Sequence, residues 1–478
     1  MRRSIHVASW AGWLLLLTPS LNAQSLRPEA AIALQNELRR IVRESSPSEA
    51  LGVAVSDAVT GQDIFSHNAH IHRNPASNMK LVTAAGVLKH LGPNFKIRTA
   101  LYGRMDDSGN VDVLVLRGQG DPSLSMSDFT ELAAQIRYRG VRRVRKVIVD
   151  GSYFDDQRLP PAFEQQPNEV SAFRAPVAAV TLERSSFLLR VRPSLSAGDT
   201  AVATLVPSGY FDVENQITTT ASGSPNIIAI QRDAGRQLSL KLRGSIPISS
   251  TRGVAYRRRV ANPLSYAAFG MVEALQRVGI RTDRLVETRK VDDPLPMLAS
   301  RQSPSVATLL QRVGKLSDNF YAEMLLKVMA AEHAAPGTSK HGAQLLEQML
   351  SEVGAPGEAT IINGSGLFEG NAITPAQLTH LLHHVYRSPS IRHEYLSHLS
   401  IAGVDGTLRR RMRDTAAQDT IRAKTGTLNG VITLSGYAVS NHRVFSFSVL
   451  CNGVRGKHAQ ARRFTDEIAT ALAIHVQR

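Results

Sequence analysis

Residues 74–88 read Asn-Pro-Ala-Ser-Asn-Met-Lys-Leu-Val-Thr-Ala-Ala-Gly-Val-Leu. Pro75 suits the opening of a helix, because proline fixes φ and has no N–H to leave unpaired. The run that follows is apolar and rich in alanine, as expected of a helix buried on most of its sides. The sequence therefore predicts a buried helix that begins near Ser77, with Ser77 and Lys80 on one face at positions i and i+3.

A lysine beside a serine in such a place forms a reactive pair. Burial disfavours the charged ammonium and lowers the pKa of the lysine, so neutral Lys80 could accept the proton of Ser77. The dipole at the start of the helix would also hold negative charge near Ser77. The Ser-x-x-Lys pattern alone decides nothing, because a chain this long is expected to contain such a match by chance.

Two further motifs follow along the chain. Residues 317–319 read Ser-Asp-Asn, and residues 424–426 read Lys-Thr-Gly immediately before a run that alternates like a strand. Ser-x-Asn also occurs at residues 66–68 and 224–226, so that motif is weak by itself. Ser-x-x-Lys, Ser-x-Asn and Lys-Thr-Gly in this order are typical of class A β-lactamases and penicillin-binding proteins. Together they predict a serine enzyme that forms an acyl intermediate.

Other stretches extend the pattern over nearly the whole chain. They are residues 118–124 (Gly-Gln-Gly-Asp-Pro-Ser-Leu), 363–367 (Asn-Gly-Ser-Gly-Leu) and 403–408 (Gly-Val-Asp-Gly-Thr-Leu). With them the chain resembles the penicillin-binding protein 4 type of D-alanyl-D-alanine carboxypeptidase/endopeptidase, the class C low-molecular-mass penicillin-binding proteins. The resemblance implies an α/β (α+β) fold, with a serine β-lactamase/transpeptidase-like catalytic domain and β-rich inserted domains.

The resemblance also implies a catalytic role for each motif residue. Ser77 would be the nucleophile and Lys80 the general base of acylation. Ser317 could relay the proton to the leaving amine, since a hydroxyl both donates and accepts. Lys424 would supply a fixed positive charge that helps keep Lys80 neutral and attracts a substrate carboxylate. Asn319 could orient Lys80 and hold the substrate amide.

Three residues of the Lys-Thr-Gly strand are expected to bind substrate. Thr425 could donate to the same carboxylate, and Gly426 would leave room for the substrate backbone beside the strand. Backbone N–H groups of Ser77 and Thr427 would form the oxyanion hole.

Two acidic residues concern the side chain of the substrate. Asp150 ends the strand-like run 147–150, and in the family a matching acid helps bind the side chain of the stem peptide; a turn or capping role is the alternative. Glu369 stands where the family usually has an arginine for that side chain. A glutamate offers only acceptors when ionised, so we expect a changed specificity, unless Glu369 faces solvent and another arginine takes over.

The spacing of the motifs predicts a large insertion. Ser77 and Ser317 are 240 residues apart, far more than a compact enzyme of this fold needs. Short strand-like runs punctuated by glycine, proline and serine fill the gap, so the insertion is expected to be β-rich. The predicted parts are residues 24–94 and 261–478 for the catalytic domain and residues 95–260 for the insertion. The resemblance implies two inserted domains, the second nested in the first.

Residues 1–23 are predicted to be a signal peptide. Arg2 and Arg3 precede an apolar core, residues 7–17, that is too short to span a bilayer comfortably. An N-terminal membrane anchor is the alternative. Cys451 is the single cysteine, so the chain has no intramolecular disulfide and must rely on its core. We expect a periplasmic protein, soluble or loosely associated with the envelope.

The charge favours anionic surroundings. Removing two arginines with the signal changes the formal net charge from +16 to +14, which suits adsorption to envelope polymers or lipid surfaces. The basic residues are scattered and no nucleic-acid motif occurs, so no nucleic-acid partner is predicted. The histidines do not cluster with acids at ligand spacing, and we predict no metal and no cofactor.

The expected partners are peptidoglycan stem peptides, with β-lactam antibiotics as acylating inhibitors. The predicted enzyme removes the terminal D-alanine from stem peptides or cuts cross-links between them, through an acyl-enzyme on Ser77. A β-lactamase of the same fold is one alternative, and it requires rapid deacylation. An inactive peptidoglycan-binding protein is another.

Overall fold

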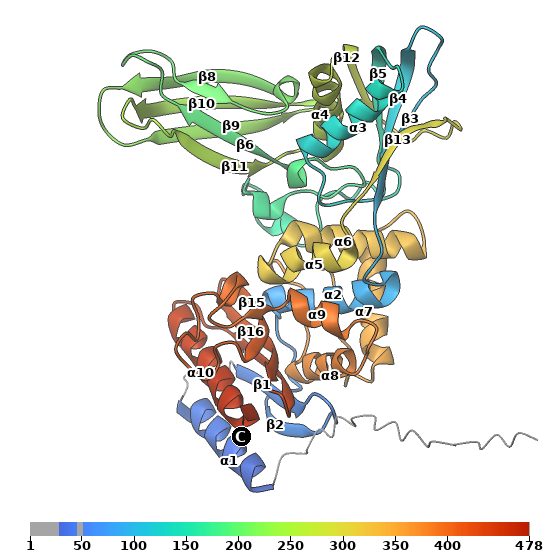
Figure 1. Ribbon diagram of the computed structural model, residues 1–478. Coiled ribbons are helices and arrows are strands. Elements are labelled where there is room, and N and C mark those ends of the chain that lie inside the picture. The colour runs from blue at the N-terminus through green and yellow to red at the C-terminus, as the bar shows by residue number, and fades with distance from the viewer. Residues whose placement is uncertain (1–27, 45–50, 478) are drawn as a thin grey trace, which may run out of the picture.

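The computed structural model describes residues 28–44 and 51–477. The predicted signal peptide, residues 1–23, lies outside the described residues. Among the helices of the described part, none is long and apolar enough to cross a membrane. Figure 1 shows two regions: a body of sheet and helices that contains the first and last described helices, and an insertion that projects from it at the top.

The body contains a six-stranded antiparallel sheet in the order β14-β15-β16-β17-β1-β2. The strands are β1 (Leu51–Asp57), β2 (Asp63–His67), β14 (Ser400–Ile401), β15 (Ile421–Leu428), β16 (Val431–Val439) and β17 (Val444–Asn452). One face packs against α1 (Pro28–Glu44) and α10 (His458–Gln477), which share a core with the sheet. α8 (Pro375–Tyr386) packs against strands β1 and β17. β15 carries Lys-Thr-Gly, as predicted.

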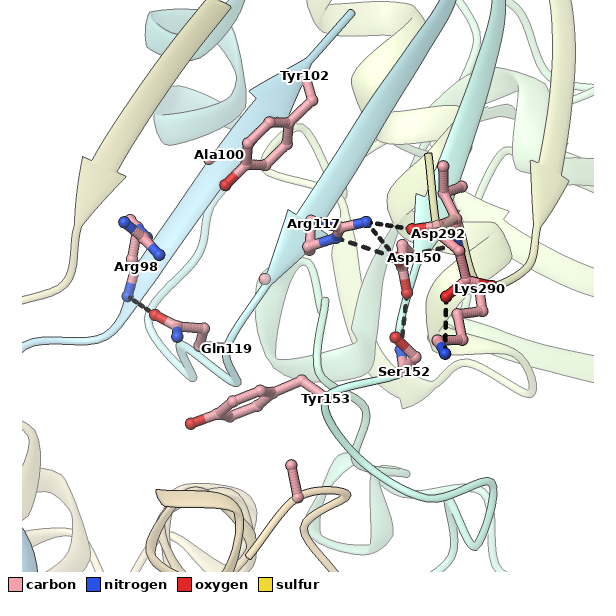
Figure 2. Close-up of a pocket in the computed structure, with 13 residues that line it drawn as sticks. Arg98, Ala100, Tyr102, Arg117, Gln119, Asp150, Ser152, Tyr153, Lys290 and Asp292 are labelled. Atoms are coloured by element: carbon pink, nitrogen blue, oxygen red, sulfur yellow. Dashed lines mark hydrogen bonds and ion pairs between the residues drawn. The ribbon is translucent and has the colours of Figure 1, made fainter. Parts of the chain in front are cut away.

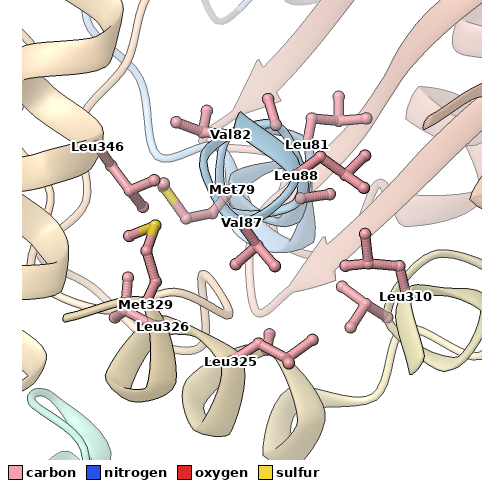
Figure 3. Close-up of a cluster of buried hydrophobic side chains, with 14 of the residues drawn as sticks. Met79, Leu81, Val82, Val87, Leu88, Leu310, Leu325, Leu326, Met329 and Leu346 are labelled. Atoms are coloured by element: carbon pink, nitrogen blue, oxygen red, sulfur yellow. The ribbon is translucent and has the colours of Figure 1, made fainter. Parts of the chain in front are cut away.

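A layer of helices completes the body, and α2 (Met79–Leu91) lies at its centre. The others are α5 (Val306–Lys315), α6 (Asn319–His333), α7 (Ser339–Glu352) and α9 (Arg392–His398). Every residue of α2 from Met79 to Leu88 is buried, and Figure 3 shows leucines of α5, α6 and α7 around it. A Cβ on Gly86 would lie only 2.3 Å from Leu346 Cδ2, so this glycine allows α7 to approach closely. The prediction of a buried helix is confirmed.

The insertion begins with a five-stranded sheet in the order β12-β5-β4-β3-β13. Its elements are β3 (Arg98–Tyr102), β4 (Asn110–Gly118), α3 (Met126–Tyr138), β5 (Arg143–Asp150), α4 (Pro263–Arg277), β12 (Arg281–Thr288) and β13 (Met297–Gln302). The predicted border at residue 260 is therefore wrong, because β12 and β13 hydrogen-bond to β5 and β3 and complete this sheet. The insertion covers residues 98–302, and it contains two helices, α3 and α4, besides its strands.

A second, all-β unit is nested between β5 and α4. It consists of two three-stranded sheets, β8-β10-β9 and β11-β6-β7. The strands are β6 (Ser186–Arg192), β7 (Val202–Thr204), β8 (Phe211–Thr220), β9 (Asn226–Ala234), β10 (Gln237–Pro247) and β11 (Val254–Arg259). Its apolar residues join the same buried cluster as α3 and α4. The predicted border at residue 260 thus lies at the end of the nested unit, not of the whole insertion.

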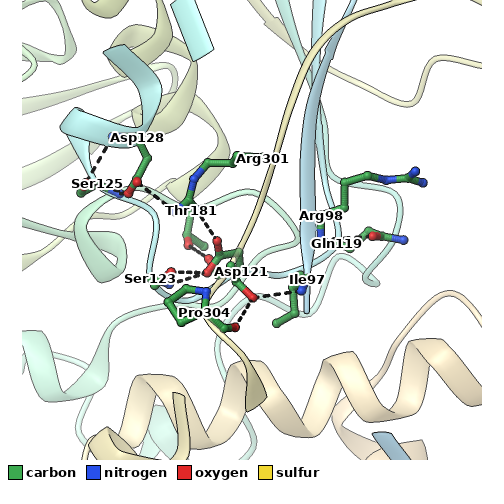
Figure 4. Close-up of polar contacts among 11 residues, drawn as sticks. Ile97, Arg98, Gln119, Asp121, Ser123, Ser125, Asp128, Thr181, Arg301 and Pro304 are labelled. Carbon is green, nitrogen blue, oxygen red and sulfur yellow. Dashed lines mark hydrogen bonds and ion pairs between the residues drawn. The ribbon is translucent and has the colours of Figure 1, made fainter. Parts of the chain in front are cut away.

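The two ends of the insertion lie side by side (Figure 4). Ile97 N donates to Ser303 Oγ at 2.9 Å, and Ser303 N donates to Ile97 O at 2.8 Å. Next to this pair, the fully buried Asp121 accepts from Ser123 N at 2.8 Å and forms an ion pair with Arg301 of β13 at 2.6 Å. Asp121 caps the turn at residues 122–123, and it also fastens β13 to the rest of the insertion.

Candidate active site

Ser77 lies in a single 3₁₀ turn, Ala76–Asn78, directly before α2. The turn follows Pro75 as predicted, but the regular helix begins two residues after Ser77, at Met79. Asn74 Oδ1 accepts from Ala76 N at 2.8 Å, and Asn74 Nδ2 donates to Phe368 O at 3.0 Å. The turn is therefore held from outside α2, and the Ser77 side chain is half-buried at the front of the helix.

Lys80 is fully buried, and its Nζ has three oxygen partners. They are Ser77 Oγ at 3.0 Å, Asn319 Oδ1 at 2.7 Å and Ser365 O at 2.6 Å. Burial lowers the pKa of Lys80 to about 7, against the opposing charges of Glu323 and Asp318. A neutral amine has two N–H groups for the two carbonyl oxygens and one lone pair left for the hydroxyl of Ser77. The contacts thus fit a base aimed at Ser77.

Glu323 of α6 is a functional neighbour that the sequence reasoning missed. It is fully buried, and its carboxylate accepts from Ser365 N at 2.7 Å and from Gly364 N at 3.2 Å. Burial raises its pKa, while these hydrogen bonds and the charge of Lys80 act in the other direction. Glu323 therefore holds the loop whose Ser365 carbonyl accepts from Lys80. The available signal was a lone acid four residues after Asn319, within an apolar helical run.

The Ser-Asp-Asn motif forms the turn that opens α6. Ser317 has a left-handed backbone with φ of 56°, which is uncommon for a residue other than glycine. Its Oγ accepts from Lys424 Nζ at 2.9 Å. Asn319 Oδ1 accepts from Lys80 Nζ at 2.7 Å, and Asn319 Nδ2 donates to Phe173 O of the insertion at 3.2 Å. The insertion therefore contacts the site itself.

Lys424 is fully buried on β15, and Lys424 Nζ also donates to Thr425 O at 2.8 Å. Burial lowers its pKa well below the usual value, and the neighbouring Lys80 lowers it further. Burial therefore acts against the fixed positive charge that was expected at Lys424. Burial, rather than Lys424, is the main reason that the pKa of Lys80 is low.

The rest of the Lys-Thr-Gly strand faces the Ser77 turn. A Cβ on Gly426 would lie 3.0 Å from Ser77 N and 2.1 Å from Thr433 Oγ1. Gly426 is thus needed for the close approach of β15 to Ser77, a reason that the sequence reasoning did not give. Thr425 Oγ1 donates to Thr407 Oγ1 at 2.8 Å, and Thr427 is exposed near the hairpin that joins β15 to β16.

Asp150 lies beside a pocket that, within the described part of the chain, includes none of the three motifs, and Figure 2 shows it next to Arg117 and Ser152. Its buried carboxylate accepts from Ser152 N at 3.0 Å, Val291 N at 3.2 Å and Arg117 Nε at 3.0 Å. Burial alone would raise its pKa, but these donors lower it overall. It borders a cavity of about 470 Å³ whose described lining residues include none of the three motifs. That cavity reaches Ala335, beyond the C-terminal end of α6, whereas the Ser-Asp-Asn motif is at the start of this helix.

Glu369 is close to the site, but its side chain is exposed. Its backbone pairs with the side chain of Gln165 from the insertion: Glu369 N donates to Gln165 Oε1 at 3.3 Å, and Gln165 Nε2 donates to Glu369 O at 3.2 Å. The neighbouring Arg174 is fully buried, donates to backbone carbonyls and stacks on the ring of Phe368. These positions favour the interpretation in which Glu369 faces solvent.

The fold and these contacts define a serine acyl-transfer enzyme of the β-lactamase/transpeptidase class. The chain belongs to the D-Ala-D-Ala carboxypeptidase 3 (S13) family, whose model matches residues 34–473. It is 32% identical over 482 residues to a D-alanyl-D-alanine carboxypeptidase of Actinomadura sp. (strain R39), covering 96% of this chain and 88% of that protein.

Solved structures agree on the fold. Penicillin binding protein 4 from Haemophilus influenzae superposes with a TM-score of 0.76 at 21% identity, covering 92% of this chain and 99% of that one. A structure of the same protein complexed with a novel β-lactam gives a TM-score of 0.71 at 22% identity, covering 90% and 98%. The predicted family and fold class are confirmed. Within the described residues, no group of three or more His, Cys, Asp or Glu could hold a metal ion.

Proposed function

We propose that the chain is a periplasmic serine D-Ala-D-Ala carboxypeptidase and/or DD-endopeptidase that acts on peptidoglycan stem peptides and is inhibited by β-lactams. The observation that carries the proposal is the environment of Lys80: its Nζ lies 3.0 Å from Ser77 Oγ and contacts two carbonyl oxygens, those of the Asn319 side chain and the Ser365 backbone. With its two N–H groups on those carbonyls, a neutral amine has its lone pair left for Ser77. Family membership supports the substrate class, and the β-lactam complex of the Haemophilus protein supports the inhibitor class.

In the proposed acylation step, Ser77 Oγ attacks the carbonyl carbon of the penultimate D-alanine while its proton passes to Lys80. The negative oxygen of the tetrahedral intermediate is held by the backbone N–H groups of Ser77 and Thr427. The peptide C–N bond then breaks, and the leaving amine takes a proton through Ser317. Water later hydrolyses the ester and returns the proton to Ser77.

Lys424 has a substrate-dependent role in this scheme. The carboxylate of the terminal D-alanine would lie beside Lys424 and Thr425, and a negative charge there favours the ammonium form of Lys424. A proton on Lys424 in turn disfavours a proton on Lys80, because the two buried amines repel each other when both are charged. Binding of the correct substrate would thus keep the base in its active form.

The test is covalent labelling with a fluorescent penicillin. Ser77→Ala should abolish labelling, and Lys80→Ala should reduce the acylation rate by about 10²–10⁴-fold with an unchanged melting temperature. Labelling that survives in Ser77→Ala would place the nucleophile elsewhere. Labelling by the wild type excludes an inactive wall-binding protein, and rapid multiple-turnover hydrolysis of the antibiotic would favour a β-lactamase instead.

Digestion of purified muropeptides separates the two peptidase activities. Mass spectrometry of cross-linked and uncross-linked substrates distinguishes loss of one D-alanine from cleavage between two stem peptides. Fractionation of the producing cells tests the periplasmic location independently.

Glu369 provides a test of side-chain specificity. If its carboxylate disfavours a free carboxylate on the stem peptide, Glu369→Arg should raise the preference for diaminopimelate over its amidated form and over lysine. The exposed position of Glu369 makes the substitution compatible with folding. A preference ratio that changes by less than about twofold, which is under ~0.5 kcal/mol, would show that Glu369 does not set the side-chain specificity.

A further inference from the structure

The segment Glu183–Ser185 joins the outer part of the insertion to the nested unit with an unusual backbone. Its three residues have φ values of 50°, 60° and 48°, a left-handed conformation that side-chain-bearing residues rarely adopt in succession. The segment is fastened on both sides: Glu183 N donates to Leu124 O, and Val260 N donates to Ser185 O, both at 2.9 Å. The surrounding structure therefore imposes the conformation and fixes the direction of Arg184.

Arg184 reaches out of the insertion to the motif that opens α6. Its Nη1 lies 3.0 Å from Asp318 Oδ2, and Arg312 Nη2 of α5 lies 3.2 Å from the same oxygen. The Asp318 side chain is only 10% exposed, and its other oxygen accepts from Tyr321 N at the start of α6. Asp318 stands between Ser317 and Asn319, so an arginine of the insertion holds the turn that carries both.

We propose that Arg184 is a positioning residue through which the insertion holds the Ser317–Asn319 turn and offsets the charge of Asp318 beside the general base, Lys80. The proposal rests on the roles that we propose for Ser77 and Lys80. It gives the insertion a part in acylation, in addition to any part in substrate binding.

The charges around Lys80 explain how Arg184 acts. Lys80 faces Glu323 and Asp318 from α6 and its cap, and Lys424 from β15. The two carboxylates favour a charged Lys80, which cannot accept the proton of Ser77. The guanidinium groups of Arg184 and Arg312 partly offset the negative charge of Asp318, so Asp318 favours the charged form of Lys80 less. Arg184 belongs to the insertion.

The test measures the second-order rate constant for acylation by benzylpenicillin as a function of pH. The acid limb of this profile is its low-pH part, where the rate rises as Lys80 loses its proton. Arg184→Gln should move the acid limb to higher pH by about half a pH unit, the effect of one nearby charge at intermediate dielectric. Asp318→Asn should move it to lower pH. Arg190→Gln is the matched control, because it removes the same charge from an exposed arginine of the nested unit and should leave the limb in place.

A purely structural role predicts a different result, a loss of rate at every pH with the limb unmoved. That result, or an equal shift in Arg190→Gln, would overturn the proposal. If Arg184→Gln does not fold, Arg312→Gln removes the other guanidinium from Asp318 and must shift the limb in the same direction. Failure of the proposed function is a separate outcome, since it appears as labelling that persists in Ser77→Ala.

Discussion

The pH dependence of acylation follows directly from the surroundings of Lys80. Only the neutral amine can accept the Ser77 proton, and burial lowers the pKa of Lys80 to about 7. The acylation rate of the wild type should therefore rise tenfold per unit at low pH and level off above about pH 7. At pH 6 it should be about one tenth of the plateau, because about one tenth of Lys80 is neutral there. Stopped-flow labelling with a penicillin from about pH 5 to about pH 9 measures this profile.

Glu323→Gln tests whether a neighbouring carboxylate raises the pKa of Lys80. It removes a carboxylate that favours the charged form of Lys80, so the acid limb should move to lower pH. The glutamine can accept with only one oxygen, which leaves an amide of the Gly364–Ser365 loop without its partner at a cost of about 1–3 kcal/mol. A melting-temperature drop should accompany the shift. A flat wild-type profile down to about pH 5, or a limb near pH 9 or above, would refute the assignment of Lys80 as the base.

Three further predictions concern packing and processing. Gly426→Ala should lower the acylation rate by about 10²-fold, measured by penicillin labelling, since its Cβ would lie 3.0 Å from Ser77 N and displace an oxyanion donor. Gly86→Ala should destabilise the body by about 1–3 kcal/mol in denaturant unfolding, because its Cβ would lie 2.3 Å from Leu346; unchanged stability would show that α7 can shift freely. Trp10 and Trp13 are the only tryptophans, so protein purified from the envelope should show no indole fluorescence, and a signal from indole would contradict cleavage of the signal peptide.

The residues that carry the chemistry could be predicted from sequence because their motifs are local. Ser77 and Lys80 are three residues apart on one turn, and Lys424 to Thr427 follow one another on a strand, so pattern and element agree. The burial of α2 was also predictable, since an apolar run without a polar face can be stable only inside a protein.

The contacts that complete the site were not predictable, because they join residues far apart in sequence. Ser365 and Glu323 act on Lys80 through a backbone carbonyl and a buried carboxylate, and neither has a pattern that reveals its partner. The prediction of the insertion's border at residue 260 was wrong for the same reason. β12 and β13 have no composition that sets them apart from the body, and only their pairing with β5 and β3 assigns them to the insertion.

The polar groups expected to bind substrate already have hydrogen-bond partners within the protein. Thr425 Oγ1 donates to Thr407, Asn319 Nδ2 donates to Phe173 O, and Lys424 Nζ donates to Ser317. A substrate must therefore exchange hydrogen bonds rather than add them, so these groups contribute little net binding free energy. Their value is orientation: each donor is held in place before the substrate arrives, and the interaction that strengthens during reaction is with the developing charge. Since one of these partners, Phe173, belongs to the insertion, the insertion sets part of the geometry on which acylation depends.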